Sequence, residues 1–231
     1  MELGIEHVPN PRTSHSRKLP IHGVCIHTTG SGVHVKAAAN WRGLSDPTQV
    51  AVALYTDKGA NFPHYVVGNK VVQIAAEDQR AWHVGIDTQD RQKYLSGTWK
   101  RMLSKDGLAL WNLMWNPRFK HPLELSPSMD PNTDFVGIEL IPEKDGTFND
   151  KQYKNLAKLI RIIFERQGLF DPLADRYDYW VYMRNIGRLV GHEDLSPLTR
   201  WNKNGGWDPG ALNKNPKFHW NKLIKNLVGL G

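Results

Sequence analysis

Near its start the chain reads Val24-Cys25-Ile26-His27-Thr28-Thr29, and the rest of the fold is expected to assemble around this run. Its apolar and β-branched residues predict a buried strand over 22–29 that carries His27 at its end. Cys25 is the only cysteine among 231 residues, so an intrachain disulfide is impossible. Within such a strand we expect Cys25 to be a small buried side chain rather than a nucleophile.

Helices and further strands are predicted downstream of this run. The clearest helix spans 149–167, where Asn149 and Gln152 form a capping-box pattern and Gly168 marks the end. Gly68-Asn69 is a two-residue hairpin signal. The other expected elements are a helix over 47–55 capped by Asp46, strands over 62–67, 70–75, 135–141 and 188–191, and a last helix over 216–228. This order predicts an α/β (α+β) fold with a central mixed β-sheet flanked by helices.

The chain is expected to form a single catalytic domain over 1–231, with a core of 18–85 and 134–231. Residues 86–133 show no clean periodicity and are interpreted as an insertion between core strands. The insertion carries Trp99, Trp111 and Trp115, which suit either a small core of its own or an extension of a binding groove.

Composition restricts the partners. Thirty Lys and Arg residues against 23 Asp and Glu residues give a net charge of +7, which favours polyanionic surroundings. The basic residues are dispersed, so no nucleic-acid partner is expected. No apolar run approaches the roughly 18 residues of a membrane span, so no stable membrane insertion is expected. The last helix suits packing on the domain or contact with an anionic membrane.

Two histidines and one aspartate stand where ordered elements are expected to end. His27 ends the first strand, His192 follows the strand over 188–191, and Asp208 precedes Pro209 in a loop. Imidazole and carboxylate are zinc ligands, and a catalytic zinc site uses three of them with one position left open. Each residue taken alone also has an ordinary interpretation, as a hydrogen-bonded core histidine or a turn aspartate.

Other catalytic signatures are missing from the sequence. Ser196 stands where the metalloprotease H-E-x-x-H motif would need its second histidine after His192. The chain has no G-x-S-x-G elbow, no P-loop and no G-x-G-x-x-G, so serine-hydrolase, phosphate-loop and dinucleotide chemistry have no support.

Six blocks in order closely resemble the type 2 N-acetylmuramoyl-L-alanine amidases, zinc enzymes that share a fold with peptidoglycan recognition proteins. These blocks are Ile26-His27-Thr28-Thr29, Phe62-Pro63-His64-Tyr65-Val66-Val67, Arg80-Ala81-Trp82-His83-Val84-Gly85, Val136-Gly137-Ile138-Glu139-Leu140, Gly191-His192-Glu193-Asp194-Leu195-Ser196-Pro197 and Asp208-Pro209-Gly210. They cover the chain except its first residues and the insertion.

The resemblance implies roles for particular residues. It implies that one zinc ion is bound by His27, His192 and Asp208, and that Glu139 is the catalytic carboxylate. It places His64, Trp82 and His83 at positions that line the substrate groove; His64 also suits an ordinary strand histidine, and Trp82 suits the core.

One departure from the family pattern concerns a lysine two residues before the aspartate ligand. Gly206 stands at that position in this chain. Lys203 is the predicted catalytic replacement, with Arg200 as the other candidate, because such sites need a donor for developing negative charge.

The implied reaction is hydrolysis of the amide between N-acetylmuramic acid and L-alanine in peptidoglycan. A lytic enzyme like a phage or prophage endolysin is expected, acting as a monomer on peptidoglycan or muropeptides. Since 1–17 lack an apolar signal region, synthesis in the cytoplasm is expected, with action on the host wall. The alternatives are a cytosolic muropeptide-recycling amidase and a peptidoglycan-binding module of the same fold that does not cleave.

Overall fold

A six-stranded mixed sheet forms the centre of the computed structural model, in the order β1-β4-β3-β5-β2-β6. The structure describes residues 3–12, 16–17, 20–57, 61–86, 88–103, 108–109, 112, 121–125, 128, 130–202, 208–211 and 216–229. The strands are β1 (Ile5–His7), β2 (Gly23–Thr28), β3 (Tyr65–Val67), β4 (Val71–Gln73), β5 (Phe135–Leu140) and β6 (Leu189–Gly191). The predicted α/β fold with a mixed sheet is confirmed.

Most neighbouring strands run parallel. β2 lies between β5 and β6 and is parallel to both, and β3 is parallel to β5. Among the described strands only β3 and β4 pair antiparallel; Val67 pairs with Val71, so the hairpin lies where it was predicted but has three connecting residues, 68–70, instead of two. Because parallel strands end at a common edge, the residues that follow β2, β5 and β6 are brought together there.

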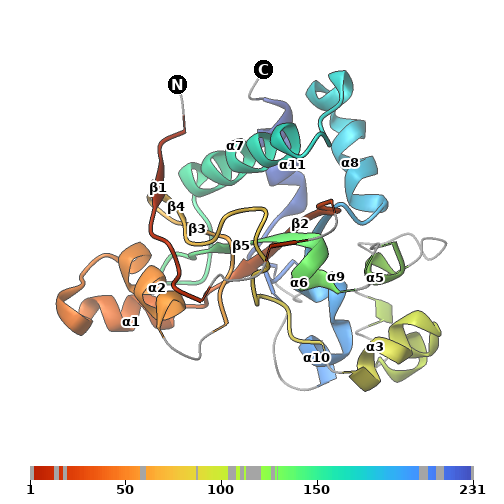
Figure 1. Ribbon diagram of the computed structural model, residues 1–231, viewed down its shortest axis with the longest axis horizontal. Helices are drawn as coiled ribbons and strands as arrows, with labels where there is room; N and C mark the ends of the chain where they lie inside the picture. The colour runs from red at the N-terminus through yellow and green to blue at the C-terminus, as the bar shows by residue number, and fades with distance from the viewer. Residues whose placement is uncertain are drawn as a thin grey trace.

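One face of the sheet is covered by helices α7 (Asp150–Arg166), α8 (Tyr177–Asn185) and α11 (Trp220–Val228) (Figure 1). Alternate residues of β5, such as Val136 and Ile138, point to this face and are fully buried. The capping box predicted for α7 is present, with Asn149 and Gln152 satisfying each other's backbone N–H groups. The last helix, α11, packs on α7. Of the two roles expected for it, packing on the domain is therefore the one that the structure shows.

The opposite face of β2, β5 and β6 packs against segments from the predicted insertion. These are α3 (Thr88–Leu95), η2 (Thr98–Met102), α5 (Pro122–Leu125) and α6 (Pro131–Asp134). Trp99 is buried in one cluster with Cys25 of β2 and Phe135 of β5. The hydrophobic core around Trp99 therefore includes residues of the sheet and is not formed by the insertion alone. Trp111 and Trp115 lie outside the described residues. No helices were predicted within 86–133, since the helices found there are short and α3 carries no apolar stripe.

Helices α1 (Gly32–Ala38) and α2 (Pro47–Thr56) cover the sheet beside β3 and β4 (Figure 1). Asp46 caps α2 by accepting a hydrogen bond from the backbone N–H of Gln49, as predicted. The remaining helices are η1 (Trp41–Gly43), η3 (Pro172–Asp175), α9 (His192–Leu195) and α10 (Pro197–Asn202).

Several boundaries differ from those predicted. β3 begins only at Tyr65, because Phe62 pairs with Trp82 in an isolated bridge instead of extending the hairpin. The last helix begins at Trp220 rather than at 216, after His219 in extended conformation. β1, α1 and α8 were not predicted. Among the described residues, none of the helices is both long enough and apolar enough to cross a bilayer.

The capping box of α7 leads to a stability prediction. Replacing Asn149 by alanine leaves the backbone N–H of Gln152 without its acceptor, so Asn149→Ala should lower the free energy of unfolding by about 1 kcal/mol. The melting temperature should fall by a few degrees. Asn149→Ser, which keeps an acceptor oxygen, is the control and should lose clearly less. Equal losses in both variants would show that the cap itself contributes little.

Candidate metal and active site

The candidate site lies where β2, β5 and β6 end. His27 is the next-to-last residue of β2 and is in register with Glu139 of the neighbouring strand β5. His192 directly follows β6 as the first residue of α9. Parallel pairing therefore brings together residues that are separated by more than a hundred positions in the sequence.

The structure brings the three predicted ligands into a close triangle. His27 Nδ1 is 3.1 Å from His192 Nδ1, His192 Nδ1 is 3.2 Å from Asp208 Oδ2, and His27 Nδ1 is 3.6 Å from Asp208 Oδ2. Ligands placed tetrahedrally at 2.0–2.1 Å from zinc would be about 3.3 Å apart. The three distances bracket that value, so the donor set fits one zinc-sized cation.

Asp208 is held in place by backbone groups. Its Oδ1 accepts a hydrogen bond of 2.6 Å from the N–H of Thr28, which leaves Oδ2 facing the histidines. The buried Glu193 fixes the loop that carries Asp208: its N–H donates to the Asp208 carbonyl, and its carboxylate accepts from the N–H groups of Gly210 and Ala211. The loop is thus bound to the first turn of α9.

The beginning of α9 is anchored by a buried ion pair. Asp194 accepts two hydrogen bonds from the Arg184 guanidinium, at 2.8 and 3.1 Å, and one from the N–H of Gly191. A side chain at position 191 would collide with Pro209, since a Cβ there would lie 2.6 Å from the proline Cδ. Glycine therefore allows the aspartate loop to approach the end of β6.

The protonation states of His192 and Asp208 favour metal binding. Burial lowers the pKa of His192 to about 3. Burial alone would raise the pKa of Asp208, but hydrogen bonds with His192 and His27 outweigh it and keep the pKa below its ordinary value. A neutral imidazole and an ionised carboxylate are the forms that bind a metal.

Glu139 lies beside the donors and is paired with a tyrosine that the sequence did not point to. The hydroxyl of Tyr55, near the end of α2, donates to Glu139 Oε1 at 2.7 Å. The other oxygen, Oε2, is inaccessible and has no hydrogen-bond partner among the described residues. Burial raises the pKa of Glu139 well above its ordinary value, the charge of Asp208 adds to this, and Tyr55 opposes it.

A cationic side chain reaches the donors from α10. The Nη2 atom of Arg200 contacts the His192 ring and lies 3.6 Å from Asp208 Oδ2. Lys203, the predicted catalytic residue, lies outside the described residues. Arg200, the other candidate, is described, and its guanidinium lies beside His192 and Asp208.

The predicted groove residues differ in exposure. Trp82 is 47% exposed, whereas His83 is 9% exposed and His64 is fully buried. His64 Nδ1 accepts a hydrogen bond from the N–H of Gly137, and its Nε2 faces the carbonyl of Gln79 and the guanidinium of Arg17. Of the three, only Trp82 offers a large surface to a ligand.

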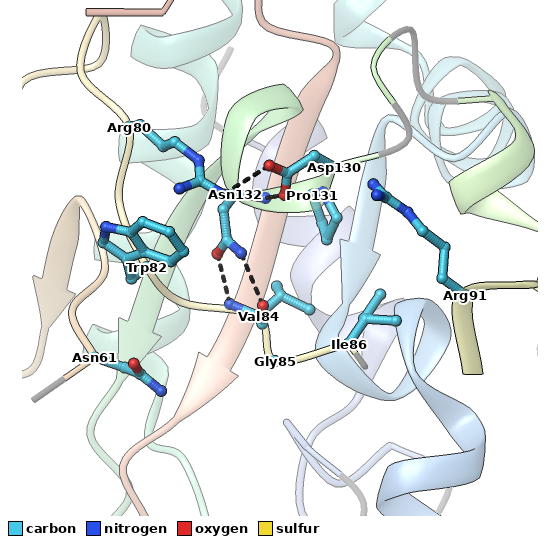
Figure 2. Close-up of a pocket in the computed structure, with 10 residues that line it drawn as sticks. All are labelled: Asn61, Arg80, Trp82, Val84, Gly85, Ile86, Arg91, Asp130, Pro131 and Asn132. Atoms are coloured by element: carbon cyan, nitrogen blue, oxygen red, sulfur yellow. Dashed lines mark hydrogen bonds and ion pairs between the residues drawn. The ribbon is translucent and has the colours of Figure 1, made fainter. Parts of the chain in front are cut away.

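A pocket of about 300 Å³ lies beside Trp82 (Figure 2). The guanidinium of Arg80 stacks 3.6 Å from the Trp82 ring and pairs with Asp130 at 2.7 Å. Asn61 and Arg91 also line this pocket. An aromatic face between hydrogen-bonding groups suits a ligand that is partly sugar or peptide.

A family model described as N-acetylmuramoyl-L-alanine amidase matches residues 17–211, which include the donors and Glu139. The chain belongs to this amidase family. A search among curated proteins found no match.

Several solved structures resemble this chain at low sequence identity. A selenomethionine derivative of AmpD is 17% identical with a TM-score of 0.51, and the alignment covers 99% of each chain. A mutant endolysin from Bacillus subtilis is 16% identical with a TM-score of 0.48, covering 98% of this chain and 99% of that one. AmpD of Citrobacter freundii is 16% identical with a TM-score of 0.44, covering 98% and 92%.

The anchor of α9 leads to a second stability prediction. Asp194→Asn removes the carboxylate charge that pairs with the buried Arg184 guanidinium, and breaking a buried pair in this way costs about 3–5 kcal/mol of unfolding free energy. Urea unfolding followed by circular dichroism measures the loss. Asp178→Asn, which breaks the exposed pair with Arg176, is the control and should change little. A small effect at both positions would mean that the buried pair does not anchor α9.

Proposed function

We propose that this protein hydrolyses the amide bond between N-acetylmuramic acid and L-alanine of peptidoglycan, with zinc bound by His27, His192 and Asp208. The observation that carries the proposal is the triangle of three donor atoms spaced as a tetrahedral cation requires, beside Glu139. A complete donor set also argues against a module that only binds the wall.

Glu139 is the proposed proton carrier. When bound, the metal would polarise the amide carbonyl and lower the pKa of the attacking water. The Glu139 carboxylate takes a proton from that water and returns it to the departing L-alanine amine, which leaves a lactyl carboxylate. Tyr55 orients Glu139 by donating to Oε1, and Oε2, which accepts no hydrogen bond from the described residues, is the proposed proton acceptor.

Arg200 is the proposed source of positive charge for the developing oxyanion. Its guanidinium approaches the donor set from α10, where it contacts the His192 ring, and its side chain is 21% exposed. A preorganised cation at such a position typically contributes a few kcal/mol to catalysis. Lys203 remains the alternative for this role.

The pocket beside Trp82 is proposed to hold part of the substrate next to the cleaved bond, with the indole face against a sugar ring or the stem peptide. The net charge of +7 suits an anionic wall polymer. We propose a lytic, endolysin-like role for a monomer that is made in the cytoplasm and reaches the wall of the host. We retain 18–85 and 134–231 as the catalytic core of one domain, with 86–133 as its insertion.

Purified wall sacculi provide the direct test. The protein should release new L-alanine amino ends from them, and a chelator should abolish this release. Glu139→Gln removes the proton carrier while keeping the hydrogen bond to Tyr55 possible, so kcat should fall about 10²–10⁴-fold with zinc still bound.

Three other results would contradict parts of the proposal. Binding to sacculi without new amino ends would indicate the binding module. Cleavage of soluble muropeptides but not of sacculi would indicate the recycling enzyme. Parental turnover by Glu139→Gln would remove Glu139 from the mechanism.

The hydrogen bond from Tyr55 leads to a pH prediction. Because the phenol stabilises the ionised form of Glu139, Tyr55→Phe should raise the pKa of this carboxyl further. The reaction needs Glu139 ionised, so the acid limb of the kcat/KM profile against pH should move to higher pH. Activity near neutral pH should fall, and alkaline activity should recover in part.

A matched variant controls for the loss of a buried phenol. Tyr65 donates in the same way to a different carboxylate, Glu77, at 2.6 Å, away from the donors. Tyr65→Phe should leave the acid limb in place. An unmoved limb in Tyr55→Phe would mean that Glu139 does not set the acid limb.

A further inference from the structure

His83 lies against β5 at a point where only glycine leaves room for it. A Cβ on Gly137 would come within 2.4 Å of the His83 Cγ atom, so the imidazole rests directly on the strand backbone. The ring stands edge-on to His27 at 5.1 Å and to His64 at 5.8 Å between centroids. It is packed between these two histidines and the sheet.

Both ring nitrogens of His83 face hydrogen-bonding partners. Its Nδ1 is 3.0 Å from His27 Nε2, and its Nε2 is 3.3 Å from the carbonyl oxygen of Phe135. The backbone beneath the ring is also fixed. The Asn132 side chain accepts from the N–H groups of His83 and Val84 and donates to the Val84 carbonyl (Figure 2 shows the bonds to Val84).

The partners determine where the protons lie. A carbonyl oxygen can only accept, so His83 Nε2 carries the hydrogen and donates it to Phe135. In a neutral ring His83 Nδ1 is then an acceptor, and it takes the Nε2–H of His27. His27 keeps its Nδ1 lone pair free, and Nδ1 is the atom that faces His192 and Asp208.

We infer that His83 is a positioning residue for metal binding, which holds His27 in the tautomer and orientation that present Nδ1 to the cation. This rests on the ligand set of the proposed function. Hydrogen bonds from a ligand's second nitrogen fix its ring and raise its basicity, and losing such a partner typically weakens metal binding 10–100-fold. His83 acts through His27 and does not itself touch the metal.

A rival arrangement uses the same residues differently. Cys25 Sγ also lies within 4.8 Å of nitrogens of His27 and His83, so these three form a second possible donor group. In that arrangement His83 would be a ligand, and Asp208 would not be needed. Cys25 is fully buried, and this group contains no carboxylate. The two arrangements differ in what a change at Cys25 does: zinc affinity falls if Cys25 is a ligand and stays unchanged if it is not.

Zinc affinity measured by competition with a chromophoric chelator tests the inference on the full chain. His83→Ala should weaken binding 10–100-fold. Gly137→Ala keeps the imidazole but displaces it, and should weaken binding comparably. His83→Asn, whose amide oxygen can replace Nδ1 as acceptor, should retain more affinity than His83→Ala. Cys25→Ala, a matched change two residues before His27, should leave affinity unchanged. Thermal unfolding of each metal-free variant checks that the fold persists.

The outcomes separate the inference from the function on which it rests. The proposed ligand set fails if the parent protein binds no zinc. It also fails if the Asp208→Ala variant binds zinc as tightly as the parent protein does. If the parent binds zinc through Asp208 but folded His83→Ala binds equally tightly, the positioning role of His83 is wrong. Loss of affinity in Cys25→Ala together with His83→Ala, but not in Asp208→Ala, would assign the metal to the rival group.

Ring-nitrogen NMR provides a readout that is independent of affinity. In ¹⁵N spectra of the zinc-loaded protein, His83 should be the Nε2–H tautomer and His27 should carry its proton on Nε2. Displacing the ring in Gly137→Ala should alter the His27 ring signals before any metal is added. A His83 ring with its proton on Nδ1 would overturn the inference, because it could not accept from His27.

Discussion

Parallel pairing of β2 with β5 and β6 is the constraint on which the site depends. It sets His27 level with Glu139 and ends β6 one residue before His192. A shift of one residue in any of these strands would turn the corresponding side chain to the opposite face, which is filled by α7 and α11. The apolar residues of these strands are buried under α7 and α11, and this burial sets the register of the strands. It thereby places His27 and Glu139 on the opposite face, at the site.

Asp208 lies outside the described strands, and buried acidic side chains hold it in place. Glu193 and Asp194 follow His192 directly and are both fully buried. Glu193 accepts hydrogen bonds from the backbone N–H groups of Gly210 and Ala211, and Asp194 pairs with Arg184 of α8. Three consecutive residues of α9 thus have different roles. His192 is a proposed metal ligand, Glu193 holds the segment after Asp208, and Asp194 connects α9 to α8.

Sequence reasoning reached the elements that local patterns determine. The run around His27, the periodic face of α7 with its Asn149 cap, and the hairpin turn each carry their signal within a few residues. Tyr55 and Asn132 carry no such signal, since their importance arises only from segments that meet in three dimensions. For the same reason the sequence could name the three donors through a family pattern but could not show their spacing.

Arg17, which lies between β1 and β2, also contributes to this site. Arg17 donates to the carbonyls of Gln79, Thr133 and Phe135 and contacts His64, and burial lowers the pKa of its guanidinium to about 10. This one side chain therefore connects the turn that follows β4, the end of α6 and the start of β5. A fragment that begins at residue 18 would lose these three hydrogen bonds, so Arg17 has to be kept together with the proposed core of 18–85 and 134–231 for the contacts behind the histidines to form.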